Sequence, residues 1–142
     1  HGERARAEAL LALLPESQAE RVTLARALFR VYDGEFEPAA EAVRALARGS
    51  AADRIEGIVN VLGYSFLRAG RPESGLPLFE LNTLVFPRSS GAWDSLAEAH
   101  MTLGHDAEAR EFYQASLEIN ANNANARAKL EELGGRAVDR SK

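Results

Sequence analysis

The sequence contains no cysteine, so disulfide bonds and thiolate chemistry are excluded. It also lacks an apolar run long enough to cross a membrane, and no signal peptide is visible. We therefore expect a soluble protein without a membrane partner. The absence of cysteine leaves the compartment open between the cytoplasm and, for an exported parent protein, the periplasm.

Basic runs are absent as well, and the net charge is −4 with acidic residues interspersed among arginines. This pattern is typical of solvated helix faces, whereas a nucleic-acid-binding domain usually carries a basic stripe. We therefore predict no nucleic-acid partner. Aromatic residues make up only 7% of the chain while alanine is abundant, and small alanine side chains favour helices packed closely against helices.

The length of 142 residues is enough for one domain with a hydrophobic core. The composition, 46% hydrophobic and 27% charged, is ordinary for a globular protein. The chain begins His1-Gly2 without a methionine, and we interpret it as part of a longer protein or a processed chain. We assign no function to His1.

Apolar residues recur at helical spacing along the chain, and no segment alternates with period two over the length of a strand. Ser17 and Ser50 begin capping patterns and are expected to be N-caps of helices. Gly134 is expected to end the last helix. The sequence therefore predicts an all-α fold built from short antiparallel helix pairs.

A period of 34 residues relates two consecutive segments of the chain. Residues of similar size recur at this spacing in the pairs Val59/Trp93, Leu62/Leu96, Phe66/His100, Gly70/Gly104, Gly75/Ala109 and Phe79/Tyr113. This is the period of the tetratricopeptide repeat, a helix–turn–helix unit. One such unit cannot bury its faces alone, so neighbouring units must stack and share their stability.

The segment "WDSLAEAHMTLGHDAEAREFYQASLEINANN" resembles one tetratricopeptide repeat, and "VNVLGYSFLRAGRPESGLPLFELNTLVFP" resembles the preceding one. The resemblance implies a single domain over residues 1–142, with antiparallel helix pairs stacked as a short right-handed superhelix, an α-α solenoid. Its expected parts are an N-terminal helix over 1–15, a degenerate repeat over 17–49, repeats over 56–89 and 90–123, a capping helix over 124–134 and a tail over 135–142.

A narrower resemblance concerns the C-terminal half. "LFELNTLVFPRSSGAWDSLAEAH" with "EFYQASLEINANNANA" is similar to the tetratricopeptide tail of some bacterial serine hydrolases of the β-lactamase-like and esterase type. It implies a catalytic domain elsewhere in a longer parent chain. This sequence has no S-x-x-K or G-x-S-x-G motif, no Gly-rich phosphate loop and no Ser/His/Asp arrangement. We therefore predict no enzyme activity and no cofactor for the chain itself.

Three residues of one expected helix depart from the repeat pattern. Gly75 replaces the usual alanine and weakens the helix by up to about 1 kcal/mol. Pro77 removes a backbone hydrogen bond and is expected to kink the helix unless it lies in the first turns. Asn82 stands where a small apolar residue is usual. It is either a half-buried amide with satisfied hydrogen bonds or the residue that fixes the turn from Pro87 to Ser89.

Two histidines, His100 and His105, lie among acidic residues and raise the question of a metal site. A helical zinc pair has histidines at i and i+4, whereas these two are five residues apart and Gly104 breaks the helix between them. His100 also falls on a repeat position that usually holds tyrosine. We therefore expect His100 to pack between helices and donate one hydrogen bond, His105 to lie in the turn, and no metal to bind.

In a tetratricopeptide array the first helix of each pair lines a concave groove, so the resemblance implies a set of groove residues. By the repeat register this set is Asn60, Tyr64, Arg68, Asp94, Glu98, Met101 and Lys129. A tyrosine, a methionine and mixed charges suit a peptide-binding groove. A solvated inner surface that binds nothing is the alternative.

The family's clamp for C-terminal carboxylates uses lysine, asparagine and arginine at set groove positions. Here those positions hold Asn60, Tyr64, Ser95, Asn125 and Lys129. Of these, only Lys129 keeps the chemistry of the clamp. The Asp94 and Glu98 pair favours a basic partner instead.

We therefore predict a non-catalytic interaction or scaffold module that binds a peptide or protein segment along the groove. The alternative function is a structural or dimerisation appendage of a hydrolase domain in a longer parent chain. In that case the partner is the catalytic domain of the same chain or a second copy that forms a homodimer.

Overall fold

The computed structural model describes residues 2, 5 and 17–140, and the described part is built from helices joined by short turns. The expected helix over 1–15 falls almost wholly outside the described residues. The described elements are α2 (Gln18–Tyr32), α3 (Phe36–Leu46), the short 3-10 helix η1 (Gly49–Ala51), α4 (Ala52–Arg68), α5 (Pro72–Val85), α6 (Ser90–Thr102), α7 (Asp106–Ile119) and α8 (Ala124–Arg140).

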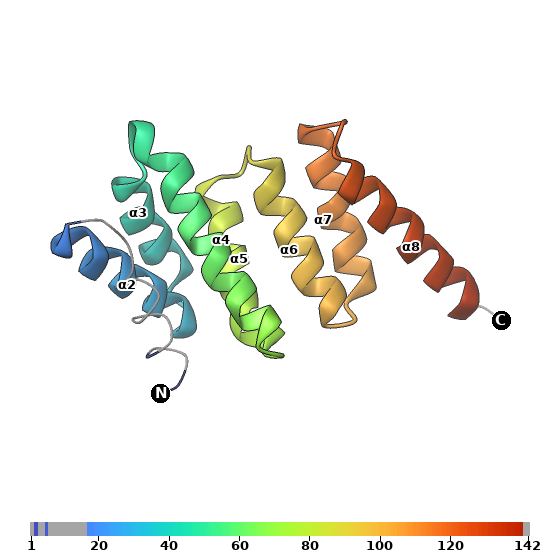
Figure 1. The fold of residues 1–142 in the computed structure, drawn as a ribbon, viewed down its shortest axis with the longest axis horizontal. Helices are drawn as coiled ribbons and strands as arrows, with labels where there is room; N and C mark the ends of the chain where they lie inside the picture. The colour runs from blue at the N-terminus through green and yellow to red at the C-terminus, as the bar shows by residue number, and fades with distance from the viewer. Residues whose placement is uncertain (1, 3–4, 6–16, 141–142) are drawn as a thin grey trace.

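The helices pack as consecutive pairs, α2 with α3, α4 with α5, and α6 with α7, and α8 packs against α7. Figure 1 shows the pairs following one another in a row, with α4 and α6 as neighbouring first helices. No strand occurs among residues 17–140. These features confirm the predicted all-α fold of stacked antiparallel helix pairs.

Each pair is closed by the same glycine turn. Gly34, Gly70 and Gly104 have φ angles of 81°, 72° and 77°, a region that side chains with a Cβ rarely adopt. In every case the backbone N–H after the glycine donates to the carbonyl four residues before it, at 2.9 Å. This bond satisfies a carbonyl at the end of the first helix. The first pair therefore keeps the turn although its sequence is degenerate.

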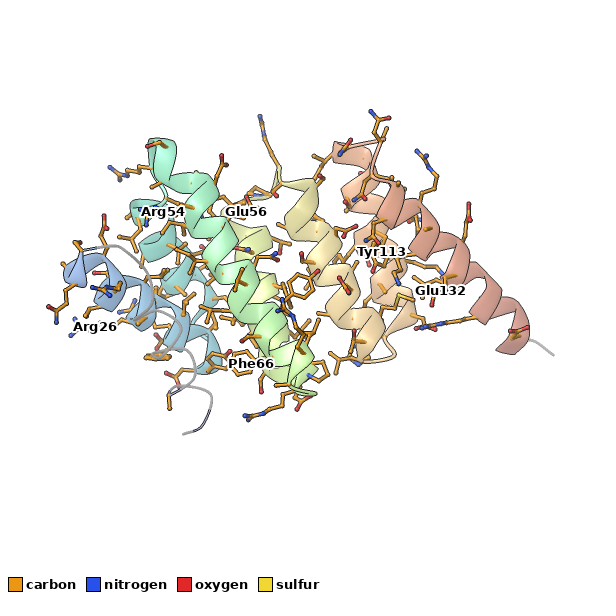
Figure 2. The ribbon with its side chains drawn as sticks, viewed as in Figure 1. Arg26, Arg54, Glu56, Phe66, Tyr113 and Glu132 are labelled. Carbon is orange, nitrogen blue, oxygen red and sulfur yellow. The ribbon has the colours of Figure 1, made fainter. Side chains whose placement is uncertain are left out.

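The hydrophobic core consists of three clusters that follow the row of helices. The first joins α2, α3, α4 and α5 and contains Phe66, whereas another joins α6, α7 and α8 and contains Tyr113. Both side chains are fully buried, and Figure 2 shows them among the helices while Arg26 lies on the outer surface. Phe79 belongs to the third cluster, which joins α4 and α5 to α6 and α7.

The backbones of α4 and α5 approach closely at two glycines. A Cβ added to Gly63 would lie 2.6 Å from the ring of Phe79, and one added to Gly75 would lie 2.7 Å from the carbonyl oxygen of Gly63. The close packing of α4 on α5 therefore requires glycine at position 75. This requirement outweighs the lower helix propensity of glycine.

Helix boundaries agree with the sequence at one expected cap and differ at two other places. Ser17 caps α2, because its Oγ accepts from the N–H of Glu20 at 3.3 Å. Ser50 is not an N-cap, since it lies within η1 and α4 begins after Ala51 without a side-chain cap. The expected end at Gly134 is also wrong, because α8 continues to Arg140 with neither of its glycines at positive φ.

Ion pairs explain why α8 does not stop at its glycines. Arg136 Nη2 lies 3.1 Å from Glu132 Oε1 within the helix, and Arg136 Nη1 lies 3.5 Å from Asp106 Oδ1 at the start of α7. These contacts hold the turn beyond Gly134 against the neighbouring helix. Glycine only weakens a helix, and tertiary contacts override that preference.

Helix α5 runs through Pro77, its sixth residue, without ending there. Asn82 of the same helix is buried, with 1% of its surface exposed, and its Nδ2 donates to the carbonyl oxygen of Glu56 at 3.0 Å. The Glu56 side chain in turn accepts from Ser89 Oγ. The amide is therefore satisfied at its nitrogen only, and it reaches the turn through Glu56 rather than directly as hypothesised.

We expect Asn82→Ala to lower the free energy of unfolding by about 1–3 kcal/mol, because a buried hydrogen bond between α4 and α5 is lost. Thermal unfolding followed by circular dichroism measures the change as a fall of several degrees in the melting temperature. Thr102→Ala is the matched control, since its exposed Oγ1 bonds only to the Glu98 carbonyl within its own helix. An unchanged melting curve for Asn82→Ala would contradict the prediction.

Candidate partner-binding groove

A groove of about 390 Å³ lies between α4 and α6, the first helices of consecutive pairs. Five lining residues come from α4 and three from α6, namely Asp53, Glu56, Gly57, Asn60 and Tyr64 together with Gly91, Asp94 and Ser95. We call this hollow the α4/α6 groove. Its α4 residues follow the spacing of one helical face, because positions 53, 56 or 57, 60 and 64 are three or four residues apart.

Tyr64 of the α4/α6 groove is held by polar contacts to α6. Its hydroxyl donates to Glu98 Oε2 at 2.5 Å and lies 3.3 Å from Ser95 Oγ. Its ring meets the Phe79 ring edge-on, with centroids 5.1 Å apart. Burial and the bond to Glu98 raise the pKa of the Tyr64 hydroxyl, so the group stays a neutral donor. The side chain therefore ties two consecutive repeats together.

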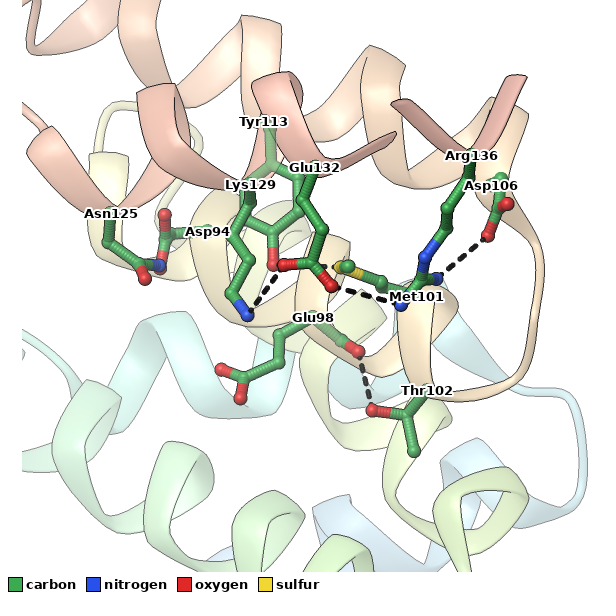
Figure 3. Close-up of polar contacts among 10 residues, drawn as sticks. All are labelled: Asp94, Glu98, Met101, Thr102, Asp106, Tyr113, Asn125, Lys129, Glu132 and Arg136. Carbon is green, nitrogen blue, oxygen red and sulfur yellow. Dashed lines mark hydrogen bonds and ion pairs between the residues drawn. The ribbon is translucent and has the colours of Figure 1, made fainter. Parts of the chain in front are cut away.

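Asp94 connects the groove to the last helix. Its two carboxylate oxygens accept from Asn123 Nδ2 at 3.0 Å and Asn125 Nδ2 at 2.9 Å, and Figure 3 shows Asn125 beside it. Asn123 also caps α8, since its Oδ1 accepts from the N–H of Ala126 at 3.1 Å. The carboxylate at the groove wall is therefore held in place by the start of α8.

Four members of the predicted set do not line the hollow: Glu98, which accepts from the Tyr64 hydroxyl, and three others. Lys129 pairs with Glu132 at 3.4 Å, and Met101 Sδ lies 4.0 Å from the hydroxyl of Tyr113 (Figure 3). Arg68 lies over the Tyr64 ring, 6.0 Å from its centroid. These side chains belong to the surroundings of the groove rather than to its lining.

The sequence register thus placed Asn60, Tyr64 and Asp94 on the groove wall, with Glu98 directly behind Tyr64. It missed four lining residues, Asp53, Glu56, Gly57 and Gly91. The sequence does carry a signal for the two glycines. Gly57 and Gly91 are 34 residues apart and therefore occupy the same repeat position.

The two histidines form a packed pair at the turn between α6 and α7. His100 is 9% exposed, its ring centroid lies 5.2 Å from that of Phe112, and its Nδ1 lies 3.1 Å from Nδ1 of His105. One imidazole donates and the other accepts, so the expected packing of His100 is confirmed, while its role as the donor stays a prediction. Within the described residues no group of three or more potential ligands is arranged to hold a metal ion.

The histidine pair predicts a loss of stability in acid. Burial, and then the neighbouring His105, lower the pKa of the His100 imidazole below its ordinary value of 6.5. Unfolded chains therefore take up a proton at His100 before folded chains do. The stabilising contribution is complete above pH 6.5 and is lost as the pH falls below it.

Urea unfolding on either side of pH 6.5 measures this loss. The variant His100→Phe places at this position the residue found at the equivalent Phe66, and it should show a weaker dependence of stability on pH. His1 lies outside the described residues and gives no structural control, so His105→Asn serves instead to break the pair alone. An identical pH dependence in the wild type and His100→Phe would rule out this origin.

Among the helices of the described part, none has the length and hydropathy of a membrane-spanning segment. No protein-family model matches the chain, and no curated protein matches its sequence.

Solved structures are similar in fold. The TPR domain of Sgt2 from Aspergillus fumigatus has a TM-score of 0.58 and 19% identity, covering 88% of this chain and 83% of that one. The first TPR domain of Spaghetti (RPAP3), bound to the HSP90 peptide SRMEEVD, has a TM-score of 0.57 and 18% identity, with 87% and 96% covered. A MamA structure, MamA MSR-1 C2, has a TM-score of 0.53 and 18% identity, with 96% and 78% covered.

These similarities confirm the tetratricopeptide-repeat fold that the 34-residue period predicts. At identities below 20% they establish the fold alone. The narrower resemblance to the tails of serine hydrolases stays a prediction.

Proposed function

We propose that this chain is a non-catalytic interaction module that binds a peptide or protein segment in the α4/α6 groove. The observation that carries the proposal is an open hollow of about 390 Å³ between equivalent helices of two repeats. Asn60 lines the hollow through the rest of its side chain, since its Oδ1 is buried.

The side chains around the hollow are already fixed before any partner arrives. Tyr64 is held by Glu98, and Asp94 is held by two asparagine amides. A preorganised site loses less side-chain entropy on binding, which favours affinity. The first TPR domain of RPAP3, which resembles this chain in fold, carries a bound peptide, and this supports the proposal.

The chemistry of the groove differs from that of a clamp for C-terminal carboxylates. Lys129 is the cation left at the clamp positions, and it is paired with Glu132. Asp53, Glu56 and Asp94 line the hollow instead. An acidic C-terminus would meet like charges there, so a clamp function of that kind is disfavoured.

Selection from a random peptide library on the immobilised chain tests the proposal. Peptides that bind should shift the amide NMR signals of Asn60, Tyr64 and Ser95 more than those of the outer surface of α2. The variant Ser95→Leu should abolish binding by filling the hollow, and Arg26→Leu is the matched control on an exposed surface. A library that yields no binder, or binders that map elsewhere, would overturn the proposal.

A structural or dimerisation appendage of a hydrolase domain is the second candidate function. It is favoured by Val61 of α4, which leaves 56% of its surface exposed and is the most exposed large apolar side chain in the described part. Light scattering decides between the two, because an appendage that dimerises should give twice the monomer mass and revert to a monomer in Val61→Asp. The groove proposal predicts a monomer for both.

A further inference from the structure

Two glycines line the α4/α6 groove at positions where neither the backbone conformation nor the packing of the chain requires glycine. Gly57 and Gly91 are helical and have no positive φ, so their backbone does not need glycine. A Cβ on Gly57 would meet nothing within 4 Å, and one on Gly91 would meet only Ser89 Oγ at an ordinary 3.7 Å. Glycine in a helix lowers stability relative to alanine. These two positions therefore carry a cost that neither turn geometry nor packing explains.

Other glycines of the same helix pairs show the contrast. Gly63 and Gly75 are required by close packing, and Gly70 and Gly104 by positive φ. Gly57 and Gly91 share one repeat position, because they are 34 residues apart, and both border the same hollow. A missing Cβ in the lining of a groove allows the backbone of another chain to approach closely.

The charge of the hollow specifies which segment fits. Asp53, Glu56 and Asp94 line it, and no described lining residue is basic. Ser89 donates to Glu56, and two asparagine amides donate to Asp94, so these carboxylates are oriented by neutral donors that do not cancel their charge. The lining of this hollow therefore offers carboxylate acceptors and negative charge, and none of its residues is a cation.

Lysine and arginine side chains supply what the hollow lacks. Both carry a positive charge and only hydrogen-bond donors. A cationic head among three carboxylates makes charge-assisted hydrogen bonds, which are shorter and stronger than neutral ones. An acidic or neutral side chain leaves the carboxylates unpaired.

A second hollow of about 640 Å³ adjoins the first and shares Asp53 and Glu56 with it. Its other lining residues include the apolar Val85, Phe86 and Ile119 and one basic residue, Arg88, and Ile119 leaves 42% of its surface exposed. The two shared carboxylates thus separate a polar, acidic hollow from a partly apolar one. A segment that crosses them would place side chains of different character on either side.

We infer that the α4/α6 groove recognises an extended protein segment in which a lysine or arginine stands next to a large apolar residue. The basic side chain enters the acidic hollow, the apolar one enters the adjoining hollow, and the segment's backbone passes over Gly57 and Gly91. This inference rests on the proposed function, since it names the partner chemistry of that same groove.

The composition of peptides selected from a random library tests the partner chemistry. Lysine or arginine next to a large apolar residue should be enriched in the selected pool relative to the starting pool. Synthetic copies of one selected peptide then measure affinity by fluorescence anisotropy. Replacing its basic residue by norleucine should weaken binding by about tenfold or more. Raising the salt concentration should weaken the binding of the parent peptide more than the binding of the norleucine version.

Variants of the chain test the glycines and the carboxylates separately. Gly57→Ala and Gly91→Ala should weaken binding by about tenfold while their resistance to urea rises. Gly134→Ala is the matched control, because it is an exposed helical glycine whose added Cβ meets nothing within 4 Å and which lies outside the groove. It should gain stability without losing affinity. Glu56→Gln keeps an acceptor for Ser89. It should weaken the binding of the basic peptide more than the binding of its norleucine version.

The outcomes separate this inference from the proposed function. Selected peptides that bind in the groove but are acidic or uncharged would overturn the inference and leave the proposed function standing. Unchanged affinity in both glycine variants would also overturn it. A second copy of the chain that occupies the groove, seen as a dimer that excludes the peptide, would overturn both.

Discussion

Truncating Phe79 to alanine should cost about 3–5 kcal/mol of unfolding free energy, the range expected for a fully buried aromatic side chain. The Phe79 side chain is 0% exposed and belongs to the cluster that joins α4 and α5 to α6 and α7. Its ring also supports the edge of Tyr64 and fills the space that Gly63 leaves. Removing it leaves a cavity that the rigid helix backbones around it cannot close.

Urea denaturation followed by circular dichroism measures this loss. Leu84→Ala in the same helix is the matched control, because Leu84 is 38% exposed and its truncation should cost well under the cost at Phe79. A cost below about 1 kcal/mol for Phe79→Ala would contradict the assigned packing. In the Phe79→Ala background Gly63→Ala should become tolerable, since the ring that a Cβ at Gly63 would strike is gone.

The second large effect has the opposite sign from the one that helix propensity predicts. Gly75→Ala should lower the free energy of unfolding by about 1–3 kcal/mol, although alanine is the better helix former. The new Cβ would lie 2.7 Å from the carbonyl oxygen of Gly63 and 2.9 Å from Leu67 Cδ1. A backbone atom cannot rotate away as a flexible side chain can, so the two helices must separate.

The comparison with Gly134→Ala isolates packing from propensity. Both substitutions change a helical glycine to alanine, yet the Cβ at position 134 meets nothing within 4 Å. That variant should gain up to about 1 kcal/mol, and the same denaturation experiment measures both. Equal gains in the two variants would show that α4 and α5 are not in close contact at Gly75.

The repeat architecture was predictable because its signals are local. Helix faces follow from apolar spacing, and the turns at Gly70 and Gly104 follow from a glycine that adopts positive φ. The size match at 34-residue spacing correctly made His100 a packing residue, the counterpart of Phe66.

Contacts between helices were harder to foresee. Asn82 binds a backbone carbonyl of another helix, and Lys129 is paired with Glu132, which the repeat register alone does not reveal. Asp53 and Glu56 are indistinguishable in sequence from solvated surface charges. They become groove residues only because α4 and α6 stand at a separation that the whole stack determines.

The bonds from Asn123 and Asn125 to Asp94 couple the opening of the last helix to ligand binding in the groove. Helix α8 packs mainly against α7, so it is the element whose local opening leaves most of the array intact. Opening it removes the Asn125 amide donor from Asp94 and loosens the hold on that carboxylate. Any ligand that requires the ordered carboxylate will therefore slow amide hydrogen exchange in α8, because coupling between two equilibria is reciprocal.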